Sequence, residues 1–305
     1  MARQSILVPF LREGNANTPK KPAIFQCNFC ELAMVAFRQS MSAIRSLLLL
    51  LLLALPAGLR AQQPFNTDDA DVTSKGQWHF EMANEIDKLN PVIFPNLRQD
   101  TLNFKFAYGI RKGIELGVDN QLIAIHKAAG NGQPANVFGY GDLDFSVKIN
   151  FLPERDGSRM PAFSGSFAVE FPTGDARRQL GSGLTDYALN GILQKSLTSR
   201  TRLRVNTGVV FAGNTLTGVI GVAARGTVFT GAASVVRDLT PRLKLGAELA
   251  GASSSNFDLG RGAIAMQAGG NYELRKNLTF DFGLLGGFFV GSPRIGLQTG
   301  FSVTW

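Results

Sequence analysis

The sequence lacks several features that would place it in common protein classes. Cysteine occurs only at Cys27 and Cys30 among 305 residues, so no disulfide framework can hold the rest of the chain together. No apolar run reaches the ~20 residues that a membrane-spanning helix needs, and the densest, residues 47–55, is about half that length. Histidine occurs only at positions 79 and 126, which leaves few candidates for general-base catalysis. A disulfide-stabilised domain and a helical membrane protein are therefore disfavoured.

The apolar run belongs to a predicted secretory signal peptide, residues 41–61. A basic residue precedes it, and the small residue Ala61 ends the segment, as in the n-region, h-region and cleavage site of such peptides. Cleavage would leave Gln62 as the mature N-terminus. Residues 1–40 are interpreted as a non-native upstream extension. Its lone pair Cys27-x-x-Cys30 lacks the second ligand pair that a zinc site needs, so we predict no metal site and no cofactor.

Removal of residues 1–61 changes the charge of the chain. The net charge of +8 falls to +3, because residues 62–305 carry 24 basic and 21 acidic side chains. This balance disfavours nucleic acid as a partner. Residues 62–75 are polar and contain the cluster Asp68, Asp69 and Asp71. They predict a periplasmic or lumen-lining lead-in rather than a calcium loop, which would need a longer ligand series.

From Gly76 onward the chain repeats one pattern, in which apolar and polar residues alternate over segments as long as a tilted membrane strand. Residues 143–151 are typical, with Leu143, Phe145 and Val147 on one face and charged or polar residues on the other. Residues 227–237 are rich in Gly, Ala and Val, so their faces cannot be assigned, and residues 218–224 are an alternative strand. Short connections alternate with long ones. The pattern predicts an all-β fold: a transmembrane antiparallel up-and-down β-barrel of about 12 strands, residues 76–305, surrounded by the lipid of a bacterial outer membrane.

The aromatic residues that prefer the membrane interface form two groups. Trp78, Tyr108, Tyr272 and Trp305 fall at one set of strand ends, and Tyr140 and Tyr187 fall at the other. Strict alternation would turn Tyr140 inward, against the expected placement, so this residue is the weak case.

The inward face predicted by alternation would line any channel through the barrel. Its acidic residues outnumber its basic ones, which disfavours selective anion transport, since that would need an arginine-rich track. Arg202 and Arg204 come nearest to such a track but are expected to pair with acids on neighbouring strands. The pore-lining candidates are Glu81, Lys105, Glu115, Asp119, Asp142, Asp144, Lys148, Arg202, Arg204, Lys244, Glu248 and Asp281.

A membrane-embedded hydrolase is the enzymatic alternative. It would need a serine close to a histidine and an orienting Asn or Asp. His126 falls at the outer end of its strand on the lipid side, where the neighbouring strand ends offer Asp100 but no serine. We therefore expect no catalytic residues.

Three motifs resemble an outer-membrane family named for the MetA pathway of phenol degradation. They are residues 64–69 with Lys75-Gly76-x-Trp78, then Gly141-Asp142-Leu143, and then residues 171–175. The resemblance implies an outer-membrane barrel that transports small molecules, including aromatic or other hydrophobic compounds. We therefore expect a channel or porin-like transporter for a small-molecule solute. A plugged structural or adhesion barrel and an outer-membrane lipid hydrolase remain the alternatives.

The last strand, residues 295–305, ends on an aromatic residue with no charge or proline to protect its edge. It is expected to pair with the first strand and close the ring. Its residues Gln298, Gly300, Val303 and Trp305 resemble the signal by which the outer-membrane assembly machinery recognises its substrates.

Deletion of Trp305 is predicted to impair insertion while secretion stays intact, because the terminal aromatic belongs to that signal. Heat-modifiable, membrane-inserted protein is the measurement, with the periplasmic yield as the control. A normal amount of inserted protein from the deletion variant would count against the signal.

Overall fold

A computed structural model of the chain describes residues 64–89, 96–127, 135–211, 226–254, 263–289 and 292–305. The predicted signal peptide with its cleavage site at Ala61 and Gln62, the cysteine pair and the alternative strand at 218–224 lie outside these residues. Within them, no helix is long and apolar enough to cross a membrane.

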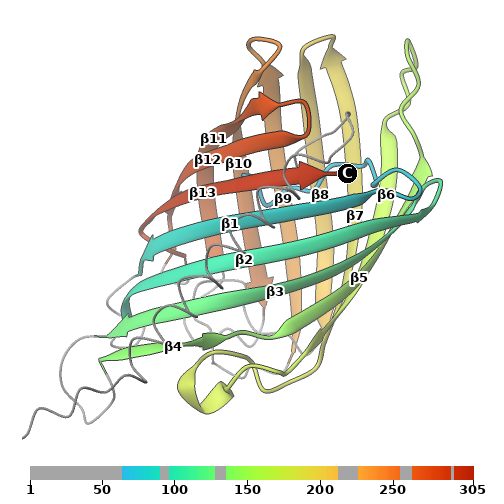
Figure 1. The fold of residues 1–305 in the computed structure, drawn as a ribbon. Helices are drawn as coiled ribbons and strands as arrows, with labels where there is room; N and C mark the ends of the chain where they lie inside the picture. Colours follow the sequence, from blue (N-terminus) through green and yellow to red (C-terminus); the bar gives the residue numbers. More distant parts are fainter. Residues whose placement is uncertain (1–63, 90–95, 128–134, 212–225, 255–262, 290–291) are drawn as a thin grey trace, which may run out of the picture. The chain divides into compact units, whose positions relative to one another are not determined.

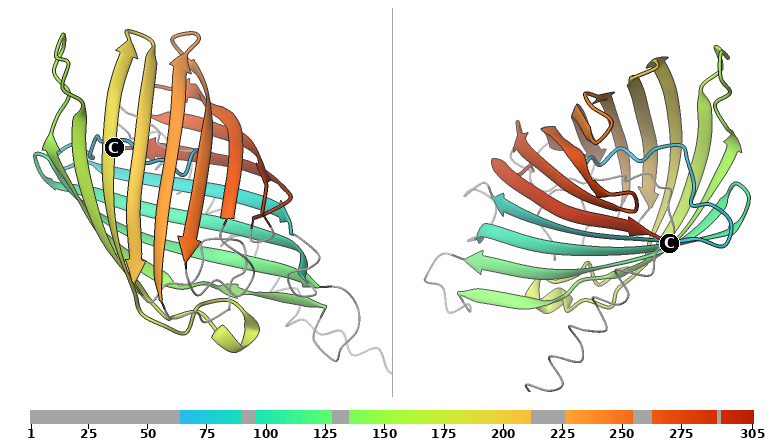
Figure 2. Two further views of the ribbon diagram at one scale, coloured as in Figure 1. Left: turned by 180° about the vertical axis from the view of Figure 1, so that it is seen from behind. Right: turned by 45° about the horizontal axis from the view of Figure 1, so that its top comes forward.

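The described residues form a single antiparallel sheet that closes on itself (Figures 1 and 2). Apart from β4 and β5, neighbouring strands along the chain pair with one another, and the first strand also pairs with the last. The elements are β1 (Trp78–Lys88), β2 (Asn96–Arg111), β3 (Ile114–Lys127), β4 (Asn136–Tyr140), β5 (Leu143–Leu152), β6 (Ala162–Phe171), the short 3₁₀ helix η1 (Ala176–Arg178), β7 (Asp186–Thr198), β8 (Thr201–Phe211), β9 (Thr227–Asp238), β10 (Leu243–Ser254), β11 (Ala263–Arg275), β12 (Leu278–Gly287) and β13 (Ile295–Thr304).

β4 and β5 together occupy one position in the wall. Both pair with β3, β4 with its second half and β5 with its first half. The barrel therefore has twelve strand positions, which confirms the predicted architecture. Four of the five connections at one end have two to four residues, and the fifth is residues 153–161. The connections at the other end, which include residues 172–185, have seven or more residues. Because bacterial barrels keep short turns in the periplasm, we refer to the two ends as the turn end and the outer end.

The interruption between β4 and β5 is a β-bulge. Leu122 pairs with Tyr140 and Asp119 with Asp144, so three residues, 141–143, stand opposite two, 120–121. The extra residue shifts the alternation by one position. Tyr140 consequently points outward and is 68% exposed, whereas Asp142 is buried inside. Strict alternation was wrong for Tyr140, and the aromatic placement of this residue agrees with the other interfacial rings.

The junction of β1 with β13 closes the barrel as predicted. The two strands pair without interruption from His79–Thr304 to Lys88–Ile295. At the turn end Trp78 and Trp305 exchange backbone hydrogen bonds of 2.8 and 2.9 Å. The last strand therefore has a partner on both sides, and its edge is covered.

The segment with unassignable faces, β9, is a regular strand paired with both β8 and β10. Phe229 and Val235 point outward, and Val228, Ser234 and Val236 are buried inside. Its glycines and alanines are small enough for either face, so its strand pairing and not its own pattern sets its orientation.

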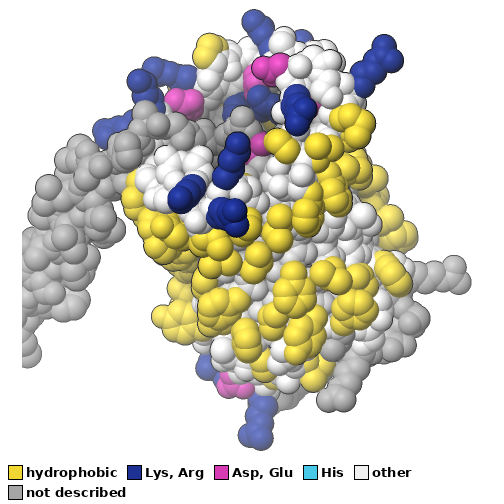
Figure 3. Space-filling view, turned by 90° about the vertical axis from the view of Figure 1, so that its right-hand side faces the viewer, with side chains coloured by type: hydrophobic (Ala, Val, Ile, Leu, Met, Phe, Trp, Pro, Cys, Tyr) yellow, Lys and Arg dark blue, Asp and Glu magenta, His cyan; other side chains and the backbone are white. Residues whose placement is uncertain are grey.

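Large apolar side chains cover the outside of the barrel, and polar ones turn inward. Phe106, Phe163, Leu284 and Phe301 are examples of outward residues that are 40–61% exposed. On the face seen in Figure 3, hydrophobic side chains form a broad band, and charged side chains gather toward its two ends. This band is the lipid-facing surface of an outer-membrane barrel.

The β1–β13 junction predicts a steric test. An added Cβ at Gly300 would lie 2.7 Å from the carbonyl oxygen of Met82 and 3.0 Å from Cα of Ala83. Gly300→Val is therefore expected to destabilise the barrel by about 1–3 kcal/mol through overpacking. The measurement is the urea midpoint of protein refolded in detergent, where no assembly machinery acts.

Gly231→Val is the matched control. Gly231 lies on an exposed outward position of β9, and the nearest atom to an added Cβ there is 4.0 Å away. Equal midpoints for the two variants would show that the junction does not need a glycine.

Candidate functional site

The alternation of the strands places the predicted pore-lining residues on the inner face. Nine of them line internal cavities: Glu81, Lys105, Asp119, Asp142, Asp144, Arg202, Arg204, Lys244 and Glu248. The other three, Glu115, Lys148 and Asp281, are at least 95% buried. The lumen is therefore a polar space surrounded by an apolar exterior.

Residues 64–74, which we call the lumenal segment, run inside the barrel (Figure 2). Pro64 and Phe65 pack against the inner wall where Gly246, Gly269 and Gly283 pair across β10, β11 and β12. An added Cβ at Gly246 or Gly269 would lie 3.0 Å from a ring atom of Phe65 or Pro64. Because these three glycines have no side chains, they leave a flat patch on the inner wall, which lets the lumenal segment approach it closely.

Hydrogen bonds fix the direction of the lumenal segment beyond the glycine patch, from residue 66 onward. The Glu248 carboxylate accepts from the backbone N–H groups of Asn66 at 3.0 Å and Thr67 at 2.6 Å. Ser164 donates to the backbone carbonyl of Ala70 on the opposite side, and the Thr73 N–H donates to Glu115 at 2.6 Å. These bonds satisfy backbone groups that would otherwise be buried without partners.

Two aspartates of the lumenal segment form ion pairs with the wall. Lys148 on β5 donates to Asp68 at 2.9 Å and lies 3.7 Å from Asp69. Arg204 on β8 lies 3.5 Å from Asp69 on the other side. The side chains of Lys148 and Arg204 are 5% and 8% exposed, so both cations depend on these acids to offset desolvation. The lumenal segment is thus fixed by charge as well as by shape.

The connection between β6 and β7, residues 172–185, enters the lumen from the outer end. Asp142, on the bulge, accepts from the N–H groups of Gly174 at 2.8 Å and Ser182 at 2.6 Å. Leu180 packs in a buried apolar cluster whose other members are inward residues of β3 and β4: Ile123, Ile125 and Val137. One carboxylate and one leucine therefore hold this connection inside the barrel.

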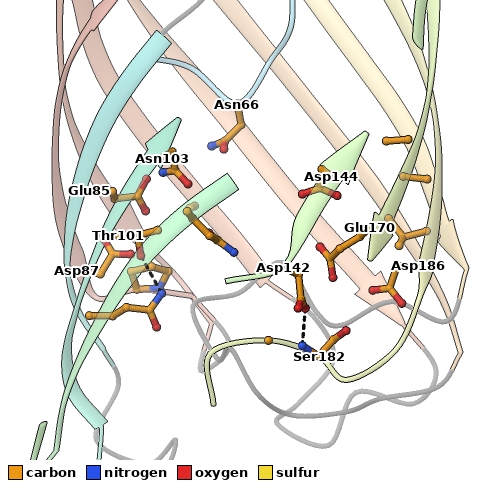
Figure 4. Close-up of a pocket in the computed structure, with 18 of the residues that line it drawn as sticks. Asn66, Glu85, Asp87, Thr101, Asn103, Asp142, Asp144, Glu170, Ser182 and Asp186 are labelled. Atoms are coloured by element: carbon orange, nitrogen blue, oxygen red, sulfur yellow. Dashed lines mark hydrogen bonds between the residues drawn. The ribbon is translucent and has the colours of Figure 1, made fainter. Parts of the chain in front are cut away.

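A cavity of about 490 Å³, here the outer cavity, lies between the lumenal segment and residues 172–185. Figure 4 shows Asn66 above it, Ser182 below it, and acidic side chains on two sides. Among the residues that the structure describes, no Lys or Arg lines it, and its carboxylates are Glu85, Asp87, Asp142, Asp144, Glu170, Asp186 and Glu248. A second cavity of about 430 Å³ shares Asn66, Asp142 and Asp144 with it and extends to Lys105 and Asp119. The outer cavity is the candidate site.

Several residues that line the outer cavity were not among the predicted pore-lining candidates. Gln99, Asn103, Gln121 and Gln267 are neutral, so a search for charged inward residues passed over them, although alternation places each on the inner face. Ser182 belongs to a connection, for which alternation gives no orientation.

Neither histidine lies in the outer cavity. His79 is buried at the β1–β13 junction, where its Nδ1 contacts the Thr304 hydroxyl and its Nε2 lies 2.7 Å from Glu81. This group joins the two strands that close the barrel. His126 lies at the outer end, 2.8 Å from Asn136 and 3.2 Å from Asp100, as its position in the strand suggested. No Ser or Thr hydroxyl is among the recorded hydrogen-bond partners of His126 in the described part of the chain.

Comparison with known proteins identifies a family. The family model described as "Putative MetA-pathway of phenol degradation" matches residues 100–305. The match includes the motifs at 141–143 and 171–175, whereas the motif at 64–78 precedes it. The comparison with curated proteins found no match.

Solved structures resemble this chain at low sequence identity, and the first of them shares its fold. An outer membrane channel from Pseudomonas putida F1 is 11% identical with a TM-score of 0.60, over 79% of this chain and 100% of that one. The NanC porin (10% identical, TM-score 0.49) covers 73% of this chain and 98% of its own. The KdgM porin (10% identical, TM-score 0.46) covers 74% and 98%.

The buried ion pair of the lumenal segment predicts that one lysine substitution and one arginine substitution lower the free energy of unfolding by unequal amounts. Lys148→Met leaves Asp68 and Asp69 without this cation inside the barrel and is expected to lower the free energy of unfolding by about 3 kcal/mol. Arg98→Met removes a partner of Asp100 from a pair in which the Arg98 side chain is 53% exposed, and it is expected to cost less than about 1 kcal/mol. Urea unfolding of the refolded variants measures both. Equal losses would contradict the role assigned to Lys148.

Proposed function

The chain belongs to the family described as "Putative MetA-pathway of phenol degradation", and we propose that it is an outer-membrane channel for passive passage of small solutes. The observation that carries the proposal is the outer cavity, a polar space of about 490 Å³ inside a barrel whose exterior is apolar. A solute in this cavity is separated from the membrane's hydrocarbon by the barrel wall and meets carboxylates and amides. The fold shared with an outer membrane channel supports this proposal.

The internal space continues past the outer cavity. The second cavity shares Asn66, Asp142 and Asp144 with it and reaches Lys105, nearer the turn end. The lumenal segment borders both cavities, so it sets the width available to a solute. Passage of small molecules fits these dimensions better than passage of an oligomer or a folded domain.

A plugged structural or adhesion barrel is the second candidate. It is favoured by the ion pairs of Asp68 and Asp69 with Lys148 and Arg204, which fill the lumen beside the lumenal segment. The open volume on the outer side of that segment favours the channel. The two candidates differ in whether a solute can pass the lumenal segment.

No described arrangement favours the lipid hydrolase, and we do not propose it. His126 lies beside Asp100 and Asn136, which are acceptors and orienting groups but not nucleophiles. The absence of enzymatic activity and the aromatic or hydrophobic nature of the solute stay predictions.

Single-channel recording in planar bilayers tests the proposal. The complete mature chain is expected to give small, stable conductance steps, and deletion of residues 64–71 is expected to give larger ones because the obstruction is removed. A second variant, Glu248→Ala, keeps the chain length and removes the acceptor that holds Asn66 and Thr67. It is expected to raise the conductance or its fluctuation.

Gly231→Val, on the lipid side, is the control and is expected to leave the conductance unchanged. Absence of conductance from the folded chain under all voltages, together with large conductance after deletion, would support the plugged barrel. Absence from both would contradict a channel of either kind.

A further inference from the structure

The basic side chains among the predicted pore-lining residues lie outside the outer cavity. Lys148 and Arg204 form ion pairs with the acidic side chains of the lumenal segment. Toward the outer end, the described lining of the outer cavity includes seven carboxylates and neither Lys nor Arg. The connections outside the described residues contribute only Arg225, Arg261 and Asp258 to the sequence of this end. The described lining of the outer cavity is therefore strongly acidic.

The carboxylates stand on opposing walls. Figure 4 places Glu85 and Asp87 on one side of the cavity and Asp144, Glu170 and Asp186 on the other. Like charges confined in one space of low dielectric repel each other, which destabilises the empty site. A bound cation between the walls would offset this repulsion at both sides.

An independent observation points to a ligand with hydrogen-bond donors. Asp87 and Gln99 both line the outer cavity, and each residue is only 4% exposed. Asp87 Oδ1 and Gln99 Oε1 have no hydrogen-bond partner among the described residues. The Gln99 amide nitrogen donates to Thr101, so the unpartnered atom is the acceptor. Buried acceptors without donors are rare because each costs about 1–3 kcal/mol, and a donor brought by a ligand would remove that cost.

We propose that the outer cavity binds a small organic cation that carries one or more ammonium groups. An ammonium group has three N–H donors and a positive charge. It can therefore donate hydrogen bonds to Asp87 on β1 and Gln99 on β2 and also offset the repulsion among the carboxylates. A molecule with a second ammonium group could also contact the opposite wall. A neutral alcohol supplies donors without the charge, and an inorganic anion is repelled by the lining. The inference deepens the proposed channel function by naming the solute class, and it rests on that function for the solute to be cargo.

Isothermal titration of the folded, complete mature chain in detergent tests the binding. The probes are 1,4-diaminobutane and its neutral analogue of equal length, 1,4-butanediol. We expect the diamine to bind, its affinity to fall as salt is raised, and the diol to show no binding. Asp87→Asn combined with Glu170→Gln is expected to weaken diamine binding about ten-fold or more, the loss expected for one hydrogen bond to a charged group.

Two further variants separate the site from general charge and from folding. Asp156→Asn combined with Glu273→Gln removes the same number of charges near the turn end and is expected to leave the affinity unchanged. Gln99→Met keeps the charge and approximate volume while it removes the unpartnered acceptor, and it is expected to weaken binding several-fold. Heat-modifiable migration confirms that each variant is folded.

Several outcomes would overturn the inference. They are diol binding as tight as diamine binding, tighter binding of Ca²⁺ than of the diamine, or equal affinity in the cavity and control double variants. Conductance measured separately distinguishes the two proposals. A conducting protein that binds no diamine overturns the solute class alone, whereas diamine binding without conductance supports the site and contradicts the channel.

Discussion

Backbone hydrogen bonding inside a hydrocarbon layer is the constraint on which the rest of this structure depends. Each strand must have a partner on both sides, since lipid offers no donors or acceptors. The pairing of β1 with β13 completes that requirement. Once the sheet is closed, alternate side chains have only two destinations, lipid or lumen. The apolar exterior, the charged interior and the cavity between the inner walls all follow from this closure.

The same constraint explains which elements could be predicted from the sequence. β5 and β13 alternate clearly, because lipid and lumen demand opposite polarity at successive residues, and the orientation of β5 was predicted correctly. β9 could not be oriented, since Ala, Gly and Val tolerate both environments. Its orientation depends on hydrogen bonds to β8 and β10, which no local pattern records. The predicted count of twelve included this weak segment as a strand and was correct.

The candidate site was less predictable than the wall that surrounds it. Alternation tells which face a residue takes, but contacts across the lumen join residues far apart, such as Asp68 with Lys148 and Thr67 with Glu248. In the sequence, Gly246, Gly269 and Gly283 are only positions of low strand propensity, since nothing local reveals which segment approaches them. Neutral acceptors such as Gln99 carry no signal until their partners, or the lack of partners in the described structure, can be examined.

One extra residue connects the wall, the connection at the outer end and the cavity. With unbroken alternation, Tyr140 and Asp142 would share a face, so either the aromatic ring would enter the lumen or the carboxylate would face lipid. A carboxylate on the lipid face is destabilising, and the bulge at residues 141–143 avoids both outcomes. It also points Asp142 at the N–H groups of Gly174 and Ser182, which hold residues 172–185 inside the barrel. The boundary of the outer cavity therefore depends on the same irregularity that keeps the barrel compatible with the membrane, which argues that the cavity is a built feature of the fold.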